Sequence, residues 1–244
     1  MSPHRSLRLA QRGVALISAL LVSALVAALA ITLVSRTNLW LNRAQNRQDL
    51  ASAQLLALGA IDLARLTLRD DGRKNQVDHL QEAWTIPIPA VNAEAGAVGG
   101  RIVELQGLFN LANLQTGEQV DAAGIKGFAR LLANIGLNPG LATVLDKALR
   151  AEIDARKDAG ITVAFPYGDL ADLAALPGFD APTRQQLQDV AVILPQVTRL
   201  NVNFASADVL SAVFPGLSNS DAAQVVNQRS GSHFASTDAF VQAV

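Results

Sequence analysis

The stretch from residue 14 to residue 34, VALISALLVSALVAALAITLV, contains no charged residue, no proline and no glycine. An α-helix rises about 1.5 Å per residue, so this stretch would be roughly 31 Å long, which matches the hydrocarbon core of a bilayer. A helix in a soluble domain usually turns one polar face to the solvent, and this stretch has no such face, which disfavours a core helix of a soluble domain. The stretch therefore predicts one membrane-spanning helix.

Basic residues flank this stretch on both sides. Residues 1–13, MSPHRSLRLAQRG, form a basic leader without an acidic residue, and the leader ends at Gly13. The arginines before the stretch are Arg5, Arg8 and Arg12, and those after it are Arg36, Arg43 and Arg47. Orientation in a membrane follows the difference in basic residues between the two flanks, so this balance leaves the orientation open.

An ordinary secretory signal peptide is a second interpretation of the same stretch. Ala28-Leu29-Ala30 has the small residues of a signal peptidase site, and cleavage there would give a mature chain that begins at Ile31. The apolar run continues to Val34, beyond this site, which favours a retained membrane helix.

The segment after Val34 predicts an amphipathic helix that continues the membrane helix. Its apolar residues recur three or four positions apart, at Leu50, Ala53, Ala57, Ala60 or Ile61, Ala64 and Leu68. No proline occurs between Val14 and Asp71, and Gly72 is a helix stop signal. Residues 14–72 are therefore expected to form one long helix.

Residues 73–117 predict a small antiparallel sheet. The expected strands are Trp84–Pro89 and Gly99–Leu105, separated by a glycine-rich turn. A sheet needs a cover for its apolar face, and we expect the apolar stripe of the long helix to provide that cover.

Residues 118–244 predict a mostly helical domain. The expected helices are 122–135, 139–158, 170–176, 183–194, 207–214, 220–229 and 236 to the end of the chain. Two turns, Leu176-Pro177-Gly178 and Phe214-Pro215-Gly216, resemble those of helix-hairpin-helix units, which bind nucleic-acid phosphates. From Leu170 to Val244, however, three basic residues stand against six aspartates, which disfavours nucleic-acid binding.

The sequence contains no pattern typical of a catalytic or metal site. Its formal net charge is −1, and it has no cysteine, which excludes disulfides and thiolate ligands. The three histidines, His4, His79 and His233, lack the spacing of a zinc motif, and no nucleotide-binding P-loop occurs. We therefore expect a protein that is not an enzyme and has no cofactor.

Arg12-Gly13 followed directly by an apolar run resembles the N-terminus of type IV pilins and pseudopilins. The resemblance implies that the prepilin peptidase cuts between Gly13 and Val14 and methylates the new N-terminus. Most members have a glutamate at the fifth mature position, which neutralises the N-terminal amine of a neighbouring subunit, whereas this chain has Ser18 there. An amine without a counter-charge is costly in lipid, so Ser18 is expected to suit a subunit that has no neighbour above it.

Three segments are similar to the K component of type II secretion systems, a minor pseudopilin. They are residues 12–22, RGVALISALLV, residues 100–114, GRIVELQGLFNLANL, and residues 200–210, LNVNFASADVL. The resemblance implies an α+β fold with a pilin-like long N-terminal helix, a small antiparallel sheet and a large inserted helical domain. It also implies a structural subunit at the pseudopilus tip, which acts in protein export across the outer membrane with the minor pseudopilins I and J.

The same resemblance implies a single-pass inner-membrane protein with its C-terminal head in the periplasm. Family members can hold calcium in the head, but no calcium-loop motif identifies ligands in this sequence. The family commonly adds final strands to the pilin sheet after the helical domain, and the sequence locates none. Two rival hypotheses are a periplasmic binding protein exported by a signal peptide and a helix-hairpin-helix DNA-binding module.

Overall fold

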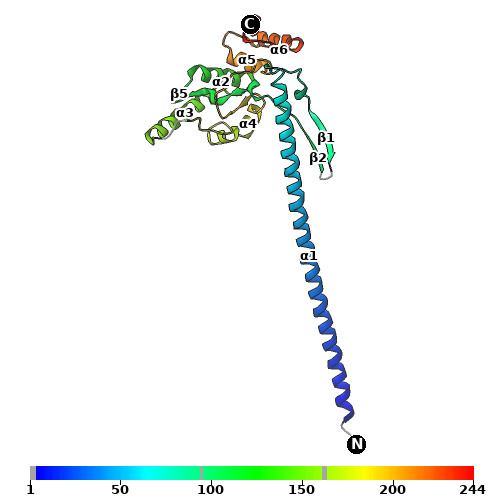
Figure 1. Cartoon of the computed structure of the whole chain (residues 1–244). Helices are drawn as coiled ribbons and strands as arrows, with labels where there is room; N and C mark the ends of the chain where they lie inside the picture. Colours follow the sequence, from blue (N-terminus) through cyan, green and yellow to red (C-terminus); the bar gives the residue numbers. More distant parts are fainter. Residues whose placement is uncertain (1–3, 94–95, 161–163) are drawn as a thin grey trace. The chain divides into compact units, whose positions relative to one another are not determined.

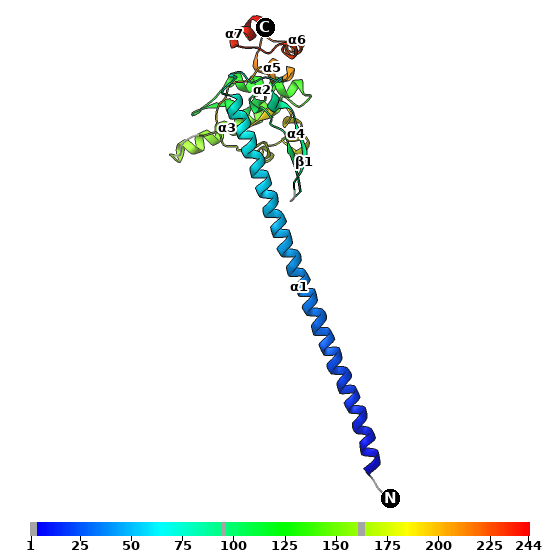
Figure 2. The same cartoon turned by 45° about the vertical axis from the view of Figure 1, so that its right-hand side comes forward.

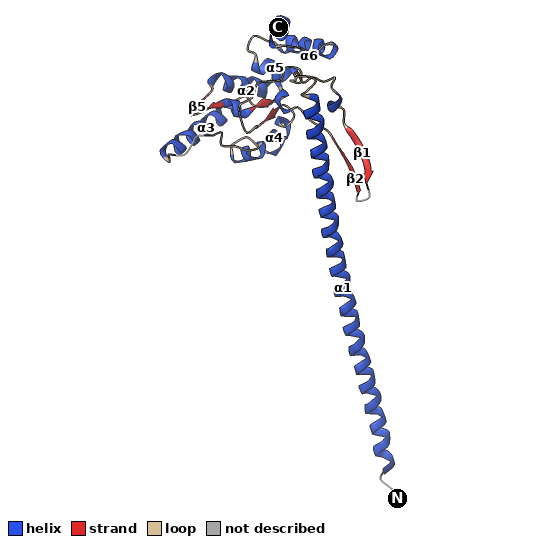
Figure 3. Cartoon of the chain, in the orientation of Figure 1, coloured by secondary structure: helices blue, strands red, loops and turns tan. Residues whose placement is uncertain are grey.

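The computed structural model describes residues 4–93, 96–160 and 164–244, with residues 4–13, 15 and 93 described as backbone only. The chain divides into two compact units. One contains the chain up to Leu63 together with Pro89–Gly100, and the other contains Ala64–Ile88 together with Arg101–Val244. Helices make up most of both units, and the strands are short (Figure 3).

The N-terminal helix α1 runs without a break from His4 to Asp71, over 68 residues (Figure 1). At about 1.5 Å per residue its length is roughly 100 Å. The prediction of one long helix is confirmed, although the helix begins before Val14 because the leader is rich in leucine and arginine, which favour helix. It ends at the predicted stop, where the amide of Gly72 donates to the carbonyl of Leu68 at 2.9 Å.

All of the apolar stripe of α1 except the half-buried Ala64 stays exposed, so the expectation that a sheet covers it is wrong. The exposed fraction is 61% for Leu50, 47% for Ile61 and 40% for Leu68. No residue from Leu16 to Asp71 is buried. The strand pair in the same unit is small, and its second strand, GAVGG, has a single side chain larger than alanine, so it offers little apolar surface.

The predicted strands 84–89 and 99–105 are wrong in position. Strand β1 is Ile88–Ala93 and pairs with β2, Gly96–Gly100, while Trp84 lies in a 3₁₀ turn, η1, of residues Ala83–Thr85. The Thr85 hydroxyl fixes this turn, because its one proton is shared by the carbonyl oxygens of Glu82 at 2.7 Å and Leu80 at 3.0 Å. These local bonds override the strand propensity of the aromatic residue.

Two further strand pairs lie in the second unit, and the sequence did not reveal them. Strand β3, Phe109–Asn110, pairs in parallel with β6, Ala191–Val192, and β4, Gln115–Thr116, pairs antiparallel with β5, Gln119–Val120. The predicted helix 183–194 is therefore wrong in its second half.

Helix α4, Ala181–Leu187, ends where this long-range pairing begins. The carbonyl of Val190 accepts the amide of Phe109 at 2.8 Å. Partners this far apart in sequence cannot be read from a local pattern, which is why the strand was missed.

The remaining predicted helices are confirmed with small shifts at their ends. They are α2 (Ala122–Asn134), α3 (Gly140–Asp158), the 3₁₀ helix η4 (Leu170–Ala175), α5 (Ala207–Val213), α6 (Asn219–Gly231) and α7 (Thr237–Ala243). Six helices of the second unit, among them α4, begin at a side chain whose oxygen accepts a hydrogen bond from a backbone N–H of the first turn. The capping residues are Asp121, Asp169, Asp180, Ser206, Ser218 and Ser236. The short polar residues at these positions explain why the starts were predictable.

The core of the second unit is built around α2. Its side chains Phe128, Leu131 and Leu132 are 0% exposed. Helix α2 packs against α3 and α5 (Figures 1 and 2). The fold is α+β, as predicted, with the long N-terminal helix, short strand pairs and a large helical region.

Candidate functional site

The predicted processing site lies inside α1. Gly13 and Val14 are consecutive residues of this helix, and the Val14 side chain is 66% exposed. Cleavage between them would make Val14 the first residue of an exposed apolar helix. The processing roles of Gly13 and Val14 stay predictions.

The Ser18 hydroxyl is satisfied within the helix. Its Oγ donates to the carbonyl oxygen of Val14 at 2.9 Å, and Thr32 and Thr37 make the same bond four residues back. Such bonds let a hydroxyl lie in lipid without an unpaired donor. The group is uncharged, and the first acidic residue after Val14 is Asp49, beyond the apolar stretch. The membrane part of α1 thus presents no carboxylate to an amine, and the tip role of Ser18 stays a prediction.

One helix in the described part of the chain is long and apolar enough to cross a membrane, and it is α1. None of its apolar window is buried. Leu20 is 63% exposed and Leu29 is 62% exposed. A continuous exposed apolar surface of this length needs lipid or other helices around it, so α1 fits a single-pass membrane anchor.

Two asparagines of the segment 100–114 hold a distant part of the chain. The Asn110 amide nitrogen donates to the Thr198 hydroxyl at 3.1 Å, and its oxygen accepts the backbone amide of Leu194 at 3.1 Å. Asn113 bonds both backbone groups of Thr198, at 3.0 Å to the amide and 2.8 Å to the carbonyl. These side chains replace the backbone pairing that a longer strand would supply.

Two asparagines of the segment 200–210 act in the same way. The Asn203 side chain is buried and bonds both backbone groups of Phe234, at 3.0 Å and 2.9 Å. The backbone amide of Asn201 donates to the Gln106 carbonyl at 2.9 Å, and its side chain donates to the Asp78 carbonyl at 3.4 Å. The two segments of the head that carry the resemblance, 100–114 and 200–210, therefore have a structural role there.

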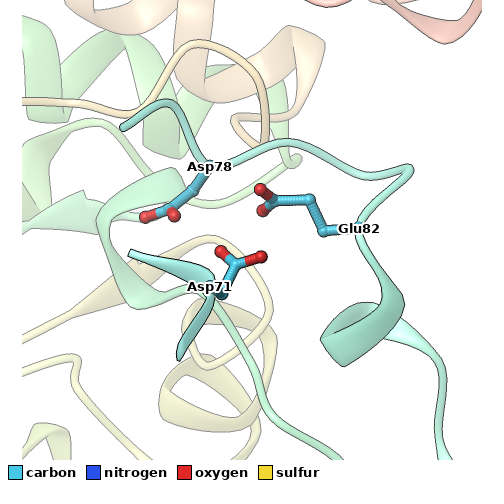
Figure 4. Close-up of side chains that lie close together, drawn as sticks. All are labelled: Asp71, Asp78 and Glu82. Carbon is cyan, nitrogen blue, oxygen red and sulfur yellow. The ribbon is translucent and has the colours of Figure 1, made fainter. Parts of the chain in front are cut away.

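Three carboxylates come together just after α1 (Figure 4). The oxygens of Asp71, Asp78 and Glu82 lie within 4.8 Å of one another. Glu82 is 7% exposed, and it is oriented by the Asn75 amide at 2.5 Å and by the indole N–H of Trp84 at 2.9 Å. The cluster is formed by the last turn of α1 and the loop that follows it.

Like charges in this cluster oppose one another. Burial, and after it the nearby Glu82 and Asp71 carboxylates, raises the pKa of Asp78. Carboxylate oxygens are the ligands that calcium prefers, and a divalent cation would neutralise the repulsion. The donor set therefore fits the calcium that the resemblance allows.

The two histidines of the head, distant in sequence, stack on each other. The rings of His79 and His233 are 3.8 Å apart with an angle of 7° between their planes. Nδ1 of His79 accepts the backbone amide of Gln81 at 3.2 Å, and the Gln81 side chain donates to the Ser230 carbonyl at 3.2 Å. Both rings serve the packing of the loop after α1. The third histidine, His4, lies where side chains are not described.

Sequence reasoning missed the acidic cluster and the function of the asparagines. Asp71, Asp78 and Glu82 match no calcium motif, because the turn after Gly72, and not a regular spacing, brings them together. The only signal was the density of carboxylates around the helix stop. The asparagines lie in segments that carry the resemblance, but the sequence assigns them no role.

Known proteins match this chain over most of its length. Family models described as type II secretion system protein K match residues 107–196 and 200–244. The type II secretion system protein K of Pseudomonas aeruginosa is 32% identical, over 97% of this chain and 78% of the relative. The protein of the same name from Klebsiella pneumoniae is 30% identical, over 95% and 79%.

One solved structure supports the same fold. It comes from the GspK-GspI-GspJ complex of the enterotoxigenic Escherichia coli type 2 secretion system, and it matches with a TM-score of 0.59 at 17% identity. The match covers 75% of this chain and 72% of that chain. From the identity to the two relatives and the length they share, the chain belongs to the type II secretion system protein K family.

Proposed function

We propose that this minor pseudopilin is cut by the prepilin peptidase between Gly13 and Val14 and stays in the inner membrane through α1. Its head then lies in the periplasm, and the protein acts as a structural subunit at the pseudopilus tip, without catalysis. It assembles there with the minor pseudopilins I and J, in the combination that names the GspK-GspI-GspJ complex.

The observation that carries this proposal is the uncovered surface of α1. The membrane stretch and the stripe through Leu50, Ile61 and Leu68 are both exposed in the single chain. Exposed apolar helix faces are stabilised by packing against other helices or lipid. A subunit whose helix packs only after assembly has this property.

The N-terminus of the mature protein tests the processing. In cells with an active secretion system, mass spectrometry should find a methylated Val14 as the first residue. Gly13→Leu should abolish the cut, because the substitution removes the residue that precedes the cut bond. The matched control Ala30→Leu should leave it unchanged. A mature chain that begins at Ile31 and depends on Ala30 would instead establish the signal-peptide rival.

Ser18→Glu tests the tip position. A carboxylate at this place could pair with the N-terminal amine of another subunit, so the variant should enter the filament below the tip and secretion should fall. Ser18→Ala, which keeps the position uncharged, is the matched control and should secrete normally. Unchanged secretion and tip assembly in Ser18→Glu would refute the charge argument.

Calcium binding is proposed for the cluster of Asp71, Asp78 and Glu82. Saturating calcium should raise the melting temperature of the full chain in detergent by about 3 °C or more, since a ligand stabilises the state that binds it. A chelator should reverse the rise, and Asp78→Asn should remove most of it. An equal response in wild type and variant would place the ion elsewhere.

A further inference from the structure

The part of α1 just beyond the membrane stretch carries a basic and aromatic face. Arg36, Trp40, Arg43 and Arg47 follow one another at spacings of four, three and four residues. At about 100° per residue these spacings place the four side chains within an arc of roughly 60°. All four are exposed, and Trp40 is 68% exposed.

The arginines of this face have no acidic neighbour on the helix. None of the residues three or four positions before or after Arg36, Arg43 and Arg47 is an aspartate or glutamate. The first acidic residue of this region is Asp49, which helical geometry places on the opposite side. Three like charges are thus left together beside the apolar stretch, so the face is complementary to an anionic surface.

Most of this face is also within reach of the lipid headgroups. Trp40 lies about 9 Å beyond Val34 along the axis, Arg43 about 14 Å and Arg47 about 20 Å, while the headgroup region extends roughly 5–8 Å beyond the hydrocarbon core. Arg47 is therefore too distant for direct contact and adds only its charge to the attraction. Side chains on a helix lean toward its N-terminus, which here is the membrane side. Tryptophan prefers this interface, and arginine extends its charged end to it.

From this face we propose that α1 has a second membrane contact, in which Arg36, Trp40 and Arg43 bind anionic phospholipid headgroups where the helix leaves the bilayer, and the charge of Arg47 strengthens the attraction. The contact rests on the membrane anchorage of the proposed function. The contact sets the depth of α1 in the bilayer and its rotation about its own axis before the subunit is assembled. It also gives a role to the arginines that balance the leader.

Lipid-specific quenching of tryptophan fluorescence tests the contact. The full chain is placed in phosphatidylcholine vesicles that contain the same fraction of either brominated phosphatidylglycerol or brominated phosphatidylcholine. The quenching that disappears in Trp40→Phe belongs to Trp40, so Trp84 can stay in place. The anionic lipid should quench Trp40 at least about two-fold more strongly than the neutral lipid, because basic residues enrich anionic lipids around them.

Replacing Arg36, Arg43 and Arg47 by glutamine should bring this ratio to about one, and high salt should do the same, since exposed charges are screened. The matched control, with Arg69, Arg73 and Arg101 changed to glutamine, removes as much charge at positions more than 30 residues after the membrane stretch and should keep the wild-type ratio.

Three results would overturn the proposal. They are equal quenching by both lipids, a ratio that survives the three glutamines, and a Trp40 that becomes shielded only when the helices of other pseudopilins are added. Flotation of the chain with the vesicles is scored separately. Flotation with no lipid preference refutes this contact alone, whereas absence of flotation refutes the membrane anchorage as well.

Discussion

The long helix and the head of this protein are stabilised by different interactions. From Leu16 to Asp71 no residue is buried, and the hydroxyls of Ser18, Thr32 and Thr37 bond to carbonyls of their own helix. In the head, Phe128 is 0% exposed, and asparagines bond to segments far away in sequence. The helix therefore depends on local bonds and the head on long-range contacts.

This difference suits an assembly subunit. A helix whose backbone hydrogen bonds are all local can pass from lipid to a bundle of other helices without refolding, because these bonds stay the same. A head with its own core keeps its shape during that transfer. Matched substitutions in the two regions can test this division.

The largest contrast is expected for buried and exposed apolar side chains. Phe128→Ala should lower the free energy of unfolding of the head by about 3–5 kcal/mol, because it leaves a cavity in the core. Leu58→Ala, at a position 58% exposed on α1, should change it by less than about 0.5 kcal/mol. Urea unfolding of the full chain in detergent, followed by near-UV circular dichroism, measures both. Similar losses would mean that α1 is packed in the single chain.

The next largest difference in stability is expected between asparagine substitutions in the head and on α1. Asn203→Ala leaves the buried amide and carbonyl of Phe234 without partners and should cost about 2–3 kcal/mol. Asn46→Ala on α1 should be neutral or slightly stabilising, since alanine has the higher helix propensity. The same unfolding measurement applies. An Asn203→Ala variant as stable as wild type would show that water replaces the two hydrogen bonds between the Asn203 side chain and Phe234.

A glycine-to-alanine substitution should change the stability of the head and that of α1 in opposite directions. A Cβ at Gly107 would lie 2.6 Å from Cβ of Phe204, so Gly107→Ala should destabilise the head by about 1–3 kcal/mol. A Cβ at Gly59 meets nothing within 4 Å, so Gly59→Ala should stabilise α1 by about 0.5–1 kcal/mol. The head is followed by urea unfolding and α1 by far-UV circular dichroism on heating. A loss of helix in Gly59→Ala would contradict the comparison.

The smallest effect concerns pH. The pKa of Asp78 is raised above 3.8 in the folded head, so the folded state holds this proton more tightly than the unfolded chain does. The stability contribution of Asp78 therefore falls as the pH rises from 3.8 through the raised value, and the full penalty is present above it. With a chelator present, Asp78→Asn should melt at a higher temperature than wild type at neutral pH. The difference should shrink on acidification through this window, and a constant difference would exclude this cause.

The helices were predictable because their signals are local. The apolar run ending at Val34, the stop at Gly72 and caps such as Asp121 and Ser206 each act over a few residues. The strands were not, because β6 exists only through its pairing with β3. Residues 99–105 show the same limit: their alternation suggested a strand that the structure places elsewhere.

By itself the sequence determined the membrane helix, most helices of the head and the family. Only the tertiary structure decided where the strands lie, that the stripe of α1 is left uncovered, and that Asp71, Asp78 and Glu82 meet. The physical reason is the range of the interactions. Helical hydrogen bonds and caps connect residues within about one turn, whereas strand pairing, core packing and charge clusters depend on where distant segments come together in space.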